Sequence, residues 1–375
     1  CIMKVKLGDL IEEYSERNVD NKYKPVAVGK YGIRSRESIY TKELAKDYSK
    51  NKLIYKGTLT VGMGSNQIDI GILRDDEIYS VSPAYHTYKI KIPNYDYLDY
   101  LLAANNNRMF SIYANRGSRQ GKTLDLKRWL TDELRLHDEK DQKIIVHTLN
   151  TVKQLISQKE AELVKLDELV KARFVEMFNM ESYPIKPLSE IAEYWNGLTY
   201  KPSDVSSDGT IVLRSSNIQD MQLDLNDIVR VKCKINNKKM VKTNDILMCS
   251  RNGSAKLVGK VALIPELEEM MSFGAFMMII RSAYYPYLMT YFQLPVFRSQ
   301  ISTGTTTINQ ITRYMLDKVS LPVPDMAKIK GFKTFVTQVD KSKFVLSNEL
   351  TMCDFYIRLI HDRVMHSRIN LRVAQ

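Results

Sequence analysis

Polar and cationic side chains gather in loop-forming stretches of this chain, and the same kinds recur in its two halves. Arginine can donate paired hydrogen bonds to guanine, asparagine can pair with adenine, and serine or threonine can bond to bases or phosphates. Lysine and the backbone amides beside glycine suit phosphate oxygens. The candidates in the first half are Lys30, Arg34, Arg36, Ser65, Asn66, Arg116, Arg119 and Lys122. The candidates in the second half are Arg214, Ser216, Asn217, Arg251, Asn252, Ser254, Lys256, Thr305, Thr306 and Thr307. Any one of them is more often solvated surface, so the hypothesis of a binding surface depends on the clusters and their recurrence.

The composition points to a globular protein with a polyanionic partner. The 375 residues carry a net charge of +12, with a pI near 9.2, which makes nucleic acid the first candidate partner. With 44% hydrophobic and 26% charged residues, the chain is not of the disordered class. We find no signal-peptide pattern and no apolar run near the ~18 residues of a membrane span, so we expect a cytoplasmic protein without membrane contact.

The search for catalytic groups finds no complete motif. The stretch 117–123 resembles a phosphate-binding loop, but Arg116 occupies the position where that loop needs its first glycine. The four cysteines are far apart and form no Cys-x-x-Cys pair, which predicts reduced thiols and no zinc ribbon. Hydrolase elbows, zinc-protease motifs, dinucleotide fingerprints, methyltransferase tetrapeptides and nuclease clusters are also missing from the sequence. The sequence therefore predicts a binding protein without a catalytic centre, metal or cofactor of its own.

The elements that must position these candidates are duplicated. Gly117 and Gly304, like Phe110 and Phe297, are 187 residues apart. The opening segments 5–11 and 185–191 also resemble each other, but at a spacing near 181, which implies a small insertion in the second copy. A period this long indicates a duplicated domain and not a solenoid.

Each copy predicts an α+β head. In the first copy, short alternating runs predict strands, and apolar residues at helical spacing predict a helix at 97–110. The expected strands are 53–55, 58–61, 68–73 and 85–90 in the first copy, and 245–248, 259–264 and 273–280 in the second. A helix from about residue 287 completes the second head.

Each head is followed by a long segment with a heptad seam. Ten seam positions spaced alternately four and three run from Ile145 to Met177, and ten matching positions run from Phe332 to Val364. The seams could pair antiparallel within one chain, or each could dock on another protein; pairing within the chain is favoured by the matched lengths and high effective concentration. Lys159, Arg173 and Lys343 interrupt the seams. They could set the register of the helices or the choice of partner. More commonly, such residues lie at the edge of a seam and extend their charged ends into solvent.

Several motifs occur in a doubled order across essentially the whole chain. They are segments 7–11 and 188–192 at the openings, 55–59 and 243–247 at a Gly-Asp-Ile/Leu-Leu-like element, 81–85 at a Ser-Pro-x-Tyr-like strand, 302–309 at a Gly-Thr-Thr-like element, and 321–324 before the last helix. On these residues the chain resembles the specificity subunit of type I restriction-modification systems. The two copies differ where Arg119 and Gln120 stand in place of Thr306 and Thr307.

The resemblance implies a fold of two similar α+β target-recognition domains separated by two long antiparallel coiled-coil helices. It implies domains at 1–140 and 181–325, with spacer helices at 141–180 and 326–375. Each head would recognise one half of a bipartite double-stranded DNA sequence, and the divergence between the copies fits two different half-sites. The helices would also bind two methyltransferase subunits, which restriction subunits join. Catalysis, with S-adenosylmethionine, ATP and Mg, would belong to those partners.

Two other functions compete with this interpretation. One is a coiled-coil scaffold whose basic heads bind acidic proteins or membranes without recognising a DNA sequence. The other is a fused restriction-methylation enzyme, which the missing motifs argue against. The target bases themselves cannot be predicted, because recognition loops follow no simple code.

Overall fold

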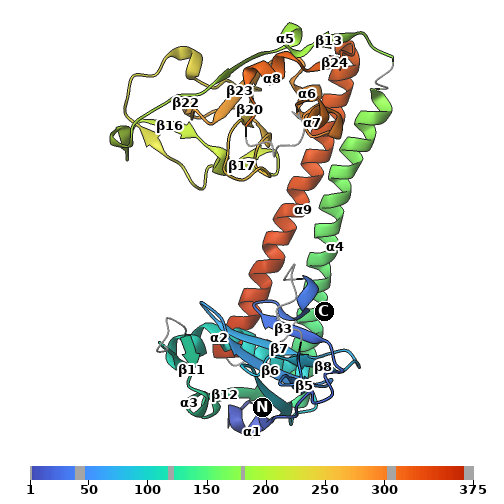
Figure 1. Ribbon diagram of the computed structural model, residues 1–375, viewed down its shortest axis with the longest axis vertical. Coiled ribbons are helices and arrows are strands. Elements are labelled where there is room, and N and C mark those ends of the chain that lie inside the picture. Colours follow the sequence, from blue (N-terminus) through green and yellow to red (C-terminus); the bar gives the residue numbers. More distant parts are fainter. Residues whose placement is uncertain (1, 39–46, 117–121, 179–181, 302–309, 367–375) are drawn as a thin grey trace. The chain divides into compact units, whose positions relative to one another are not determined.

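Packing divides the chain into two compact units, each with a sheet-rich head. The computed structural model describes residues 2–38, 47–116, 122–178, 182–301 and 310–366. Unit 1 comprises Cys1–Glu160 and Ser347–Gln375, and unit 2 comprises Ala161–Leu346. Two long helices, α4 (Glu139–Met177) and α9 (Met326–His366), each contribute one half to each unit (Figure 1). The predicted α+β class with two heads and two long helices is confirmed, and the units cut across the four expected segments.

The head of unit 1 is built on two four-stranded sheets. One sheet has the antiparallel order β2-β9-β6-β7, and the other has the order β4-β3-β8-β5 with β3 and β8 parallel. Strand β1 pairs with β12, and β10 pairs with β11. The strands are β1 (Ile2–Lys6), β2 (Ile11–Tyr14), β3 (Pro25–Gly29), β4 (Gly32–Ser35), β5 (Lys52–Ile54), β6 (Thr58–Met63), β7 (Ile68–Ile72), β8 (Tyr79–Val81), β9 (His86–Ile90), β10 (Ala114–Arg116), β11 (Lys122–Leu124) and β12 (Glu133–His137). The helices are α1 (Leu7–Leu10), α2 (Tyr95–Tyr113) and α3 (Leu126–Leu130), with a 3-10 turn at Arg36–Ser38.

The head of unit 2 repeats this plan. Its sheets have the orders β14-β23-β20-β21 and β15-β19-β16-β22, the latter again with one parallel pair, β16 and β22. The strands are β13 (Ile185–Pro187), β14 (Glu193–Asn196), β15 (Val205–Ser206), β16 (Thr210–Leu213), β17 (Ile218–Gln219), β18 (Gln222–Leu223), β19 (Arg230–Val231), β20 (Ile246–Cys249), β21 (Val261–Leu263), β22 (Met271–Phe273), β23 (Met277–Arg281) and β24 (Ser320–Pro322). The helices are α5 (Leu188–Ile191), α6 (Tyr285–Tyr291), α7 (Pro295–Ile301) and α8 (Arg313–Asp317), with 3-10 turns at Pro202–Asp204, Ser215–Asn217 and Asn237–Lys239.

The duplication extends to single turns. Gly57 before β6 has φ 79°, and Asn244 before β20, 187 residues later, has φ 69°. Glycine and asparagine are the residues that adopt this left-handed conformation most readily. In the first turn, Thr58 Oγ1 accepts a hydrogen bond from the backbone N–H of residue 55 at 3.0 Å. In the second, Asp245 Oδ2 accepts a hydrogen bond from the backbone N–H of residue 242 at 2.7 Å. The two turns are therefore built alike.

The expected strand at 273–280 is wrong, because two strands in different sheets share that segment. Strand β22 ends at Phe273, β23 begins at Met277, and the Met277 N–H donates to Gly274 O at 2.8 Å to close the turn. The break comes where the main chain of Gly197 crosses, since a Cβ there would lie 2.1 Å from Phe273 O. Residues 82–85 likewise form a turn between β8 and β9, and not the continuous strand expected at 81–85.

The helix expected from about residue 287 is also divided. Helix α6 ends at Tyr291, and α7 begins at Pro295, whereas α2 in unit 1 continues unbroken for 19 residues. Proline has no N–H to donate to the preceding turn, so it stops one helix and suits the first position of the next. The buried residues Leu101 in α2 and Leu288 in α6 still match at the 187-residue spacing.

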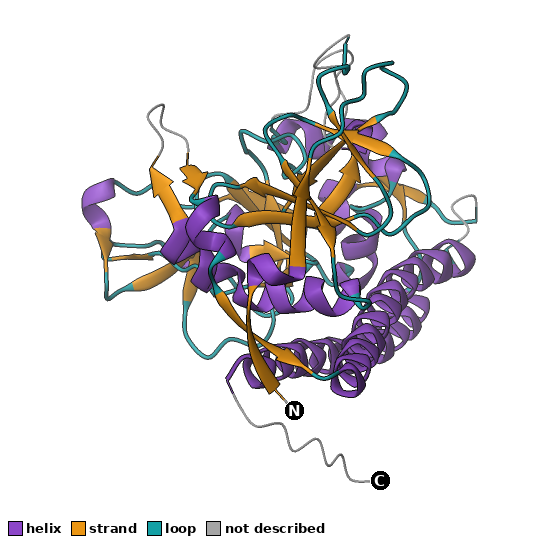
Figure 2. Cartoon of the chain, turned by 90° about the horizontal axis from the view of Figure 1, so that it is seen from below, coloured by secondary structure: helices purple, strands orange, loops and turns teal. Residues whose placement is uncertain are grey.

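The long helices pack antiparallel within each unit and close the core of its head. In unit 1, Ile145 and Leu149 of α4 belong to the same apolar cluster as Ile357 and Ile360 of α9. In unit 2, Phe174 of α4 and Phe178 just after it form an aromatic cluster with Phe332 of α9 and Tyr287 of α6, with ring centroids 5.0–5.5 Å apart. Burying each such ring stabilises the fold by roughly 1.5–3 kcal/mol. The two long helices run without an internal loop or strand (Figure 2).

The basic interruptions of the seams form ion pairs. Lys159 Nζ of α4 binds Glu349 Oε2 of α9 in unit 1, and Lys343 Nζ of α9 binds Asp167 Oδ1 of α4 in unit 2. Arg173 lies over the Phe335 ring, with its Cζ 5.9 Å from the centroid, and pairs with Glu176. All three cations therefore contact the opposite helix, two of them through ion pairs, which supports a role in register.

The described residues contain neither a metal-ligand cluster nor a disulfide. Cys233, Cys249 and Cys353 are all free thiols. No group of three histidine, cysteine or carboxylate side chains is arranged to hold a metal ion within the described ranges. Among the helices of that same part of the chain, none has the length and apolar character needed to cross a membrane.

Candidate nucleic-acid interface

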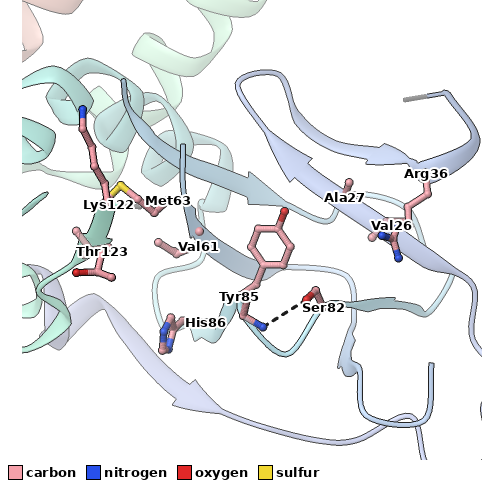
Figure 3. A pocket seen from close by; sticks show the side chains of 13 residues that line it. Val26, Ala27, Arg36, Val61, Met63, Ser82, Tyr85, His86, Lys122 and Thr123 are labelled. Atoms are coloured by element: carbon pink, nitrogen blue, oxygen red, sulfur yellow. Dashed lines mark hydrogen bonds between the residues drawn. The ribbon is translucent and has the colours of Figure 1, made fainter. Parts of the chain in front are cut away.

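A cleft of about 550 Å³ in unit 1 lies between two β-hairpins. The β3–β4 hairpin and the turn after it supply Ala27 and Arg36, and the β10–β11 hairpin supplies Lys122. Figure 3 shows Arg36 and Lys122 on opposite sides of Tyr85. The cleft therefore has cationic residues from two hairpins on its walls.

Tyr85 is held firmly between the sheets. Its hydroxyl donates to Val28 O at 3.0 Å, and its backbone carbonyl accepts Lys52 Nζ at 2.7 Å. Burial lowers the pKa of Lys52. A Cβ on Gly62 would lie 2.4 Å from the Tyr85 ring, so only glycine leaves room for this packing. His86 beside it faces Glu13, with Nδ1 3.3 Å from Oε1.

The tip of the β3–β4 hairpin is basic and aromatic. Gly29 pairs with Gly32, so the turn consists of Lys30 and Tyr31 alone. Tyr31 is 71% exposed. Its ring centroid lies 5.6 Å from Lys30 Nζ and 5.2 Å from the Arg34 guanidinium carbon. Such contacts hold flexible cationic side chains near one aromatic ring.

The structure brings two other predicted residues of unit 1 together. Lys122 Nζ donates to the backbone carbonyl of Ser65 at 2.7 Å and lies 4.5 Å from the centroid of the Phe110 ring. The β6–β7 turn, with Ser65 and Asn66 both exposed, is thereby connected to β11. Arg36 lies against Tyr48, its guanidinium carbon 5.7 Å from the ring centroid.

In unit 2, the two predicted loops of the head lie together. Asn252 Nδ2 donates to Ser215 Oγ at 3.1 Å, which joins the loop after β20 to the turn after β16. Asn252 Oδ1 also accepts the Ser254 N–H at 2.9 Å, so this amide orders its own loop. Arg251 is exposed, and its guanidinium carbon lies 5.4 Å from the centroid of the Phe276 ring. Ser216, Ser254 and Lys256 are exposed on the same two loops.

Asn217 serves the fold and is removed from the predicted contacts, whereas Arg214 is partly exposed and its predicted contact stays a prediction. Asn217 is fully buried: its Nδ2 donates to the carbonyls of Asp224 and Asp227 at 2.8 Å each, and its Oδ1 accepts the Arg214 N–H at 2.8 Å. An amide with these bonds satisfied inside the loop cannot bind a base edge. The Arg214 guanidinium pairs with Asp227, Nη2 to Oδ2, at 2.9 Å.

Some predicted contacts lie outside what the structure describes. Arg119, Thr305, Thr306 and Thr307 fall outside the described residues, and so does the glycine-rich part of the phosphate-loop-like stretch, 117–121. Of Arg116 only the backbone is described, where it pairs with Lys122 across β10 and β11.

Sequence reasoning missed the aromatic partners of the cations. Tyr31 could have been suspected, because it lies in a Gly-Lys-Tyr-Gly turn between two strand-like runs. Phe276, which is 59% exposed, carried no such signal, because it was expected to lie inside a continuous strand. Only the break between β22 and β23 brings it to the surface beside Arg251.

Comparison with known proteins gives one curated relative and several similar structures. No protein-family model matches the chain. The specificity subunit of the type I restriction enzyme StySPI from Salmonella potsdam is 28% identical over 177 residues, which are 44% of this chain. The match spans only 38% of that relative's length.

Solved structures match nearly the whole chain. A chain of a type I restriction-modification system, solved in a study of complex assembly and conformational transition, has a TM-score of 0.61 at 14% identity, covering 97% of both chains. The chain is similar to type I specificity subunits in sequence and has their fold. The S subunit from M. genitalium has a TM-score of 0.54 at 12% identity and covers 98% of this chain and 97% of its own. The resemblance found in the sequence motifs is thus confirmed.

Proposed function

We propose that this chain selects DNA targets, as the specificity subunit of a type I restriction-modification system. The observation that carries the proposal is the repeated head, with the same central sheet order in both units and a long helix after each. Two alike heads with different loop residues suit a bipartite target with two different half-sites. The net charge of +12 favours a polyanionic partner, and phosphate contacts contribute much of the affinity in such complexes.

Each head would contact DNA with the cationic loops described above. In unit 1 these are the hairpins on both sides of the cleft, with Lys30, Arg34, Arg36 and Lys122. In unit 2 they are the two joined loops with Arg251, Asn252 and Lys256. Arginine and asparagine supply the donors that distinguish bases in the major groove, and lysine supplies charge at phosphates.

The long helices would serve as spacer and as a docking surface. Helix α4 is unbroken over 39 residues, about 58 Å at 1.5 Å per residue. Apolar side chains that the helix pair leaves exposed include Val164, Leu169 and Val175 of α4, and Phe344 and Phe355 of α9. We propose that they bind two methyltransferase subunits, which restriction subunits join. Catalysis, with S-adenosylmethionine, ATP and Mg, would then reside in those partners and not in this chain.

Salt-dependent duplex binding tests the proposal. The full chain, alone and with its methyltransferase subunits, is titrated with labelled duplex DNA of random sequence between about 50 and about 200 mM salt. If the heads make several phosphate contacts each, affinity should fall by about 10³-fold or more across this range. An unlabelled duplex selected for tight binding should displace the labelled DNA at a lower concentration than an unlabelled random duplex does. Equal competition under all conditions, or binding only to acidic proteins or anionic vesicles, would favour the scaffold alternative.

A further inference from the structure

At two glycines on the candidate surfaces, neither the packing nor the backbone conformation requires the absence of a side chain. Gly29 ends β3, and Gly253 lies in the loop after β20. A Cβ atom on either would meet no atom within 4 Å, and neither residue has a positive φ. Glycine loses more conformational freedom on folding than alanine, so an alanine here would be tolerated or would stabilise the chain. The fold alone gives no reason for glycine at either position.

The other glycines that the structure describes differ from this pair. Gly62, Gly71 and Gly197 have neighbours closer than a Cβ allows, and a further group has backbone conformations that side chains rarely adopt. That group consists of Gly32, Gly57, Gly209 and Gly259. Gly274 and Gly331 have their nearest neighbours at ordinary contact distances of 3.6 and 3.8 Å. Within the described ranges, open space and an ordinary backbone occur together only at Gly29 and Gly253.

The two glycines share the same surroundings. Beside Gly29, Lys30 and Arg34 lie against the exposed ring of Tyr31. Beside Gly253, Arg251 lies against the exposed ring of Phe276. Among the residues that the structure describes, none of these three cations pairs with a carboxylate. Each of these two glycines is therefore next to a cation whose side chain is restrained by contact with an aromatic ring.

We propose that Gly29 and Gly253 are points of close approach for the DNA sugar-phosphate backbone, one in each unit. This inference rests on the proposed function. Without a Cβ, a phosphate can lie against the main chain and accept hydrogen bonds from peptide N–H groups, while the neighbouring cation offsets its charge. Close approach of a ligand is a known reason for glycine where the fold does not demand it.

A phosphate contact makes a specific prediction about sequence preference. Phosphates carry no direct sequence information, so a side chain that pushes them away weakens binding to every duplex by the same factor. A side chain that displaced a base contact would instead change which sequence is preferred. Affinities measured for several duplex sequences therefore distinguish a phosphate contact from a base contact.

The experiment compares Gly29→Ala and Gly253→Ala with wild type in the full chain, assembled with its methyltransferase subunits. Gly331→Ala is the matched control, because its new Cβ meets only Met177 Cε at 3.8 Å on the exposed side of α9. Binding is measured on a random-sequence duplex and on a duplex selected for tight binding, and thermal unfolding is followed in parallel. We expect each head variant to lose about five- to tenfold in affinity on both duplexes, with a Tm no lower than wild type. Gly331→Ala should bind as wild type does.

Several results would overturn the inference. Unchanged affinity in both head variants would leave DNA binding intact and remove the proposed contact. A loss of affinity accompanied by a lower Tm would assign the glycines to the fold, and a changed sequence preference would assign them to base recognition. Absence of duplex binding by the wild-type assembly would overturn the proposed function, and this inference with it.

Discussion

Arg251 is the cation in unit 2 whose surroundings best fit DNA contact. Arg251 is exposed, its guanidinium lies against Phe276, and its side chain forms no ion pair among the described residues, whereas the Asn252 side chain beside it bonds to Ser215 and Ser254. We predict that Arg251→Ala weakens duplex binding without lowering stability. If it contacts a phosphate, the slope of log affinity against log salt should decrease by about 1. Binding isotherms at several salt concentrations check this.

Asn217→Ala is the contrasting variant. It removes the amide that satisfies three backbone groups in the buried loop, so it should destabilise unit 2 by about 1–3 kcal/mol. A stable Asn217→Ala chain, or an Arg251→Ala chain that unfolds more easily than wild type, would contradict this division of roles.

Buried His137 and partly buried His361 predict how stability depends on pH. Burial lowers the pKa of His137, and burial with the nearby Lys153 lowers that of His361. Both belong to unit 1, and the unit 2 segment contains no histidine. Below the ordinary pKa of about 6.5, the unfolded chain binds protons that the folded state refuses, so unit 1 should lose stability as pH falls from about 7.5 to about 5.5.

The two tryptophans allow this to be measured for each unit separately. Trp129 is buried in unit 1, and Trp195 lies in unit 2. In a Trp195→Phe chain, urea unfolding followed by fluorescence should show a midpoint that falls with pH. The Trp129→Phe chain should show a much smaller change. Unit 1 variants with His137→Gln and His361→Gln should respond less to pH; an undiminished response would place its origin elsewhere.

Residue type alone could not separate recognition residues from residues that hold the fold. Asn217 and Asn252 both occur in polar loops of the second head, yet one is buried and the other half-exposed. The difference arises from the path of the following loop, because the Asn217 amide bonds to the backbone carbonyls of Asp224 and Asp227. A sequence pattern carries no information about that depth.

At the scale of elements, the cross-helix ion pairs should fix the register of the long helices. Lys159 is 22% exposed in its pair with Glu349, which is 48% exposed. We predict that Lys159→Glu and Glu349→Lys each destabilise unit 1 by about 1 kcal/mol, because each brings like charges together. The double variant should restore stability to within about 0.5 kcal/mol of wild type, since it re-forms the pair with reversed charges.

Trp129 fluorescence during urea unfolding measures these changes in unit 1. Asp354→Lys is a matched control, because Asp354 is also an exposed acidic residue of α9 without an ion pair among the described residues. It should change stability little. Additive losses in the double variant, with no recovery, would show that the pair does not set register.

Helices with a strongly periodic sequence could be predicted. Strand breaks at points where a sequence-distant segment of main chain packs against the strand could not. The heptad seams from Ile145 to Met177 and from Phe332 to Val364 predicted two long helices, and the described helices are Glu139–Met177 and Met326–His366. By contrast, the apolar run 273–280 contains a turn at the point where the main chain of Gly197 lies against Phe273 and Gly274. Within a short apolar run, periodicity alone cannot place such a break.

For the whole molecule, the repeated heads predict modular specificity. Replacing residues 1–140 with those of a relative of different specificity should change one half of the target and leave the other half and the gap unchanged. The core of unit 2 contains no residue from the exchanged segment, so its head should keep its structure. Sequencing of DNA methylated by the assembled complex would reveal both halves. A change in both halves would contradict independent heads.

Selection from a random duplex pool asks directly whether this chain recognises a two-part DNA sequence. The full chain with its methyltransferase subunits is incubated with the pool at near-physiological salt, and the retained duplexes are sequenced over successive rounds. We expect two short enriched motifs of different sequence, separated by a gap of constant length and no preferred bases. Retained DNA with no enriched motif, or with a single motif that survives replacement of either head, would contradict it.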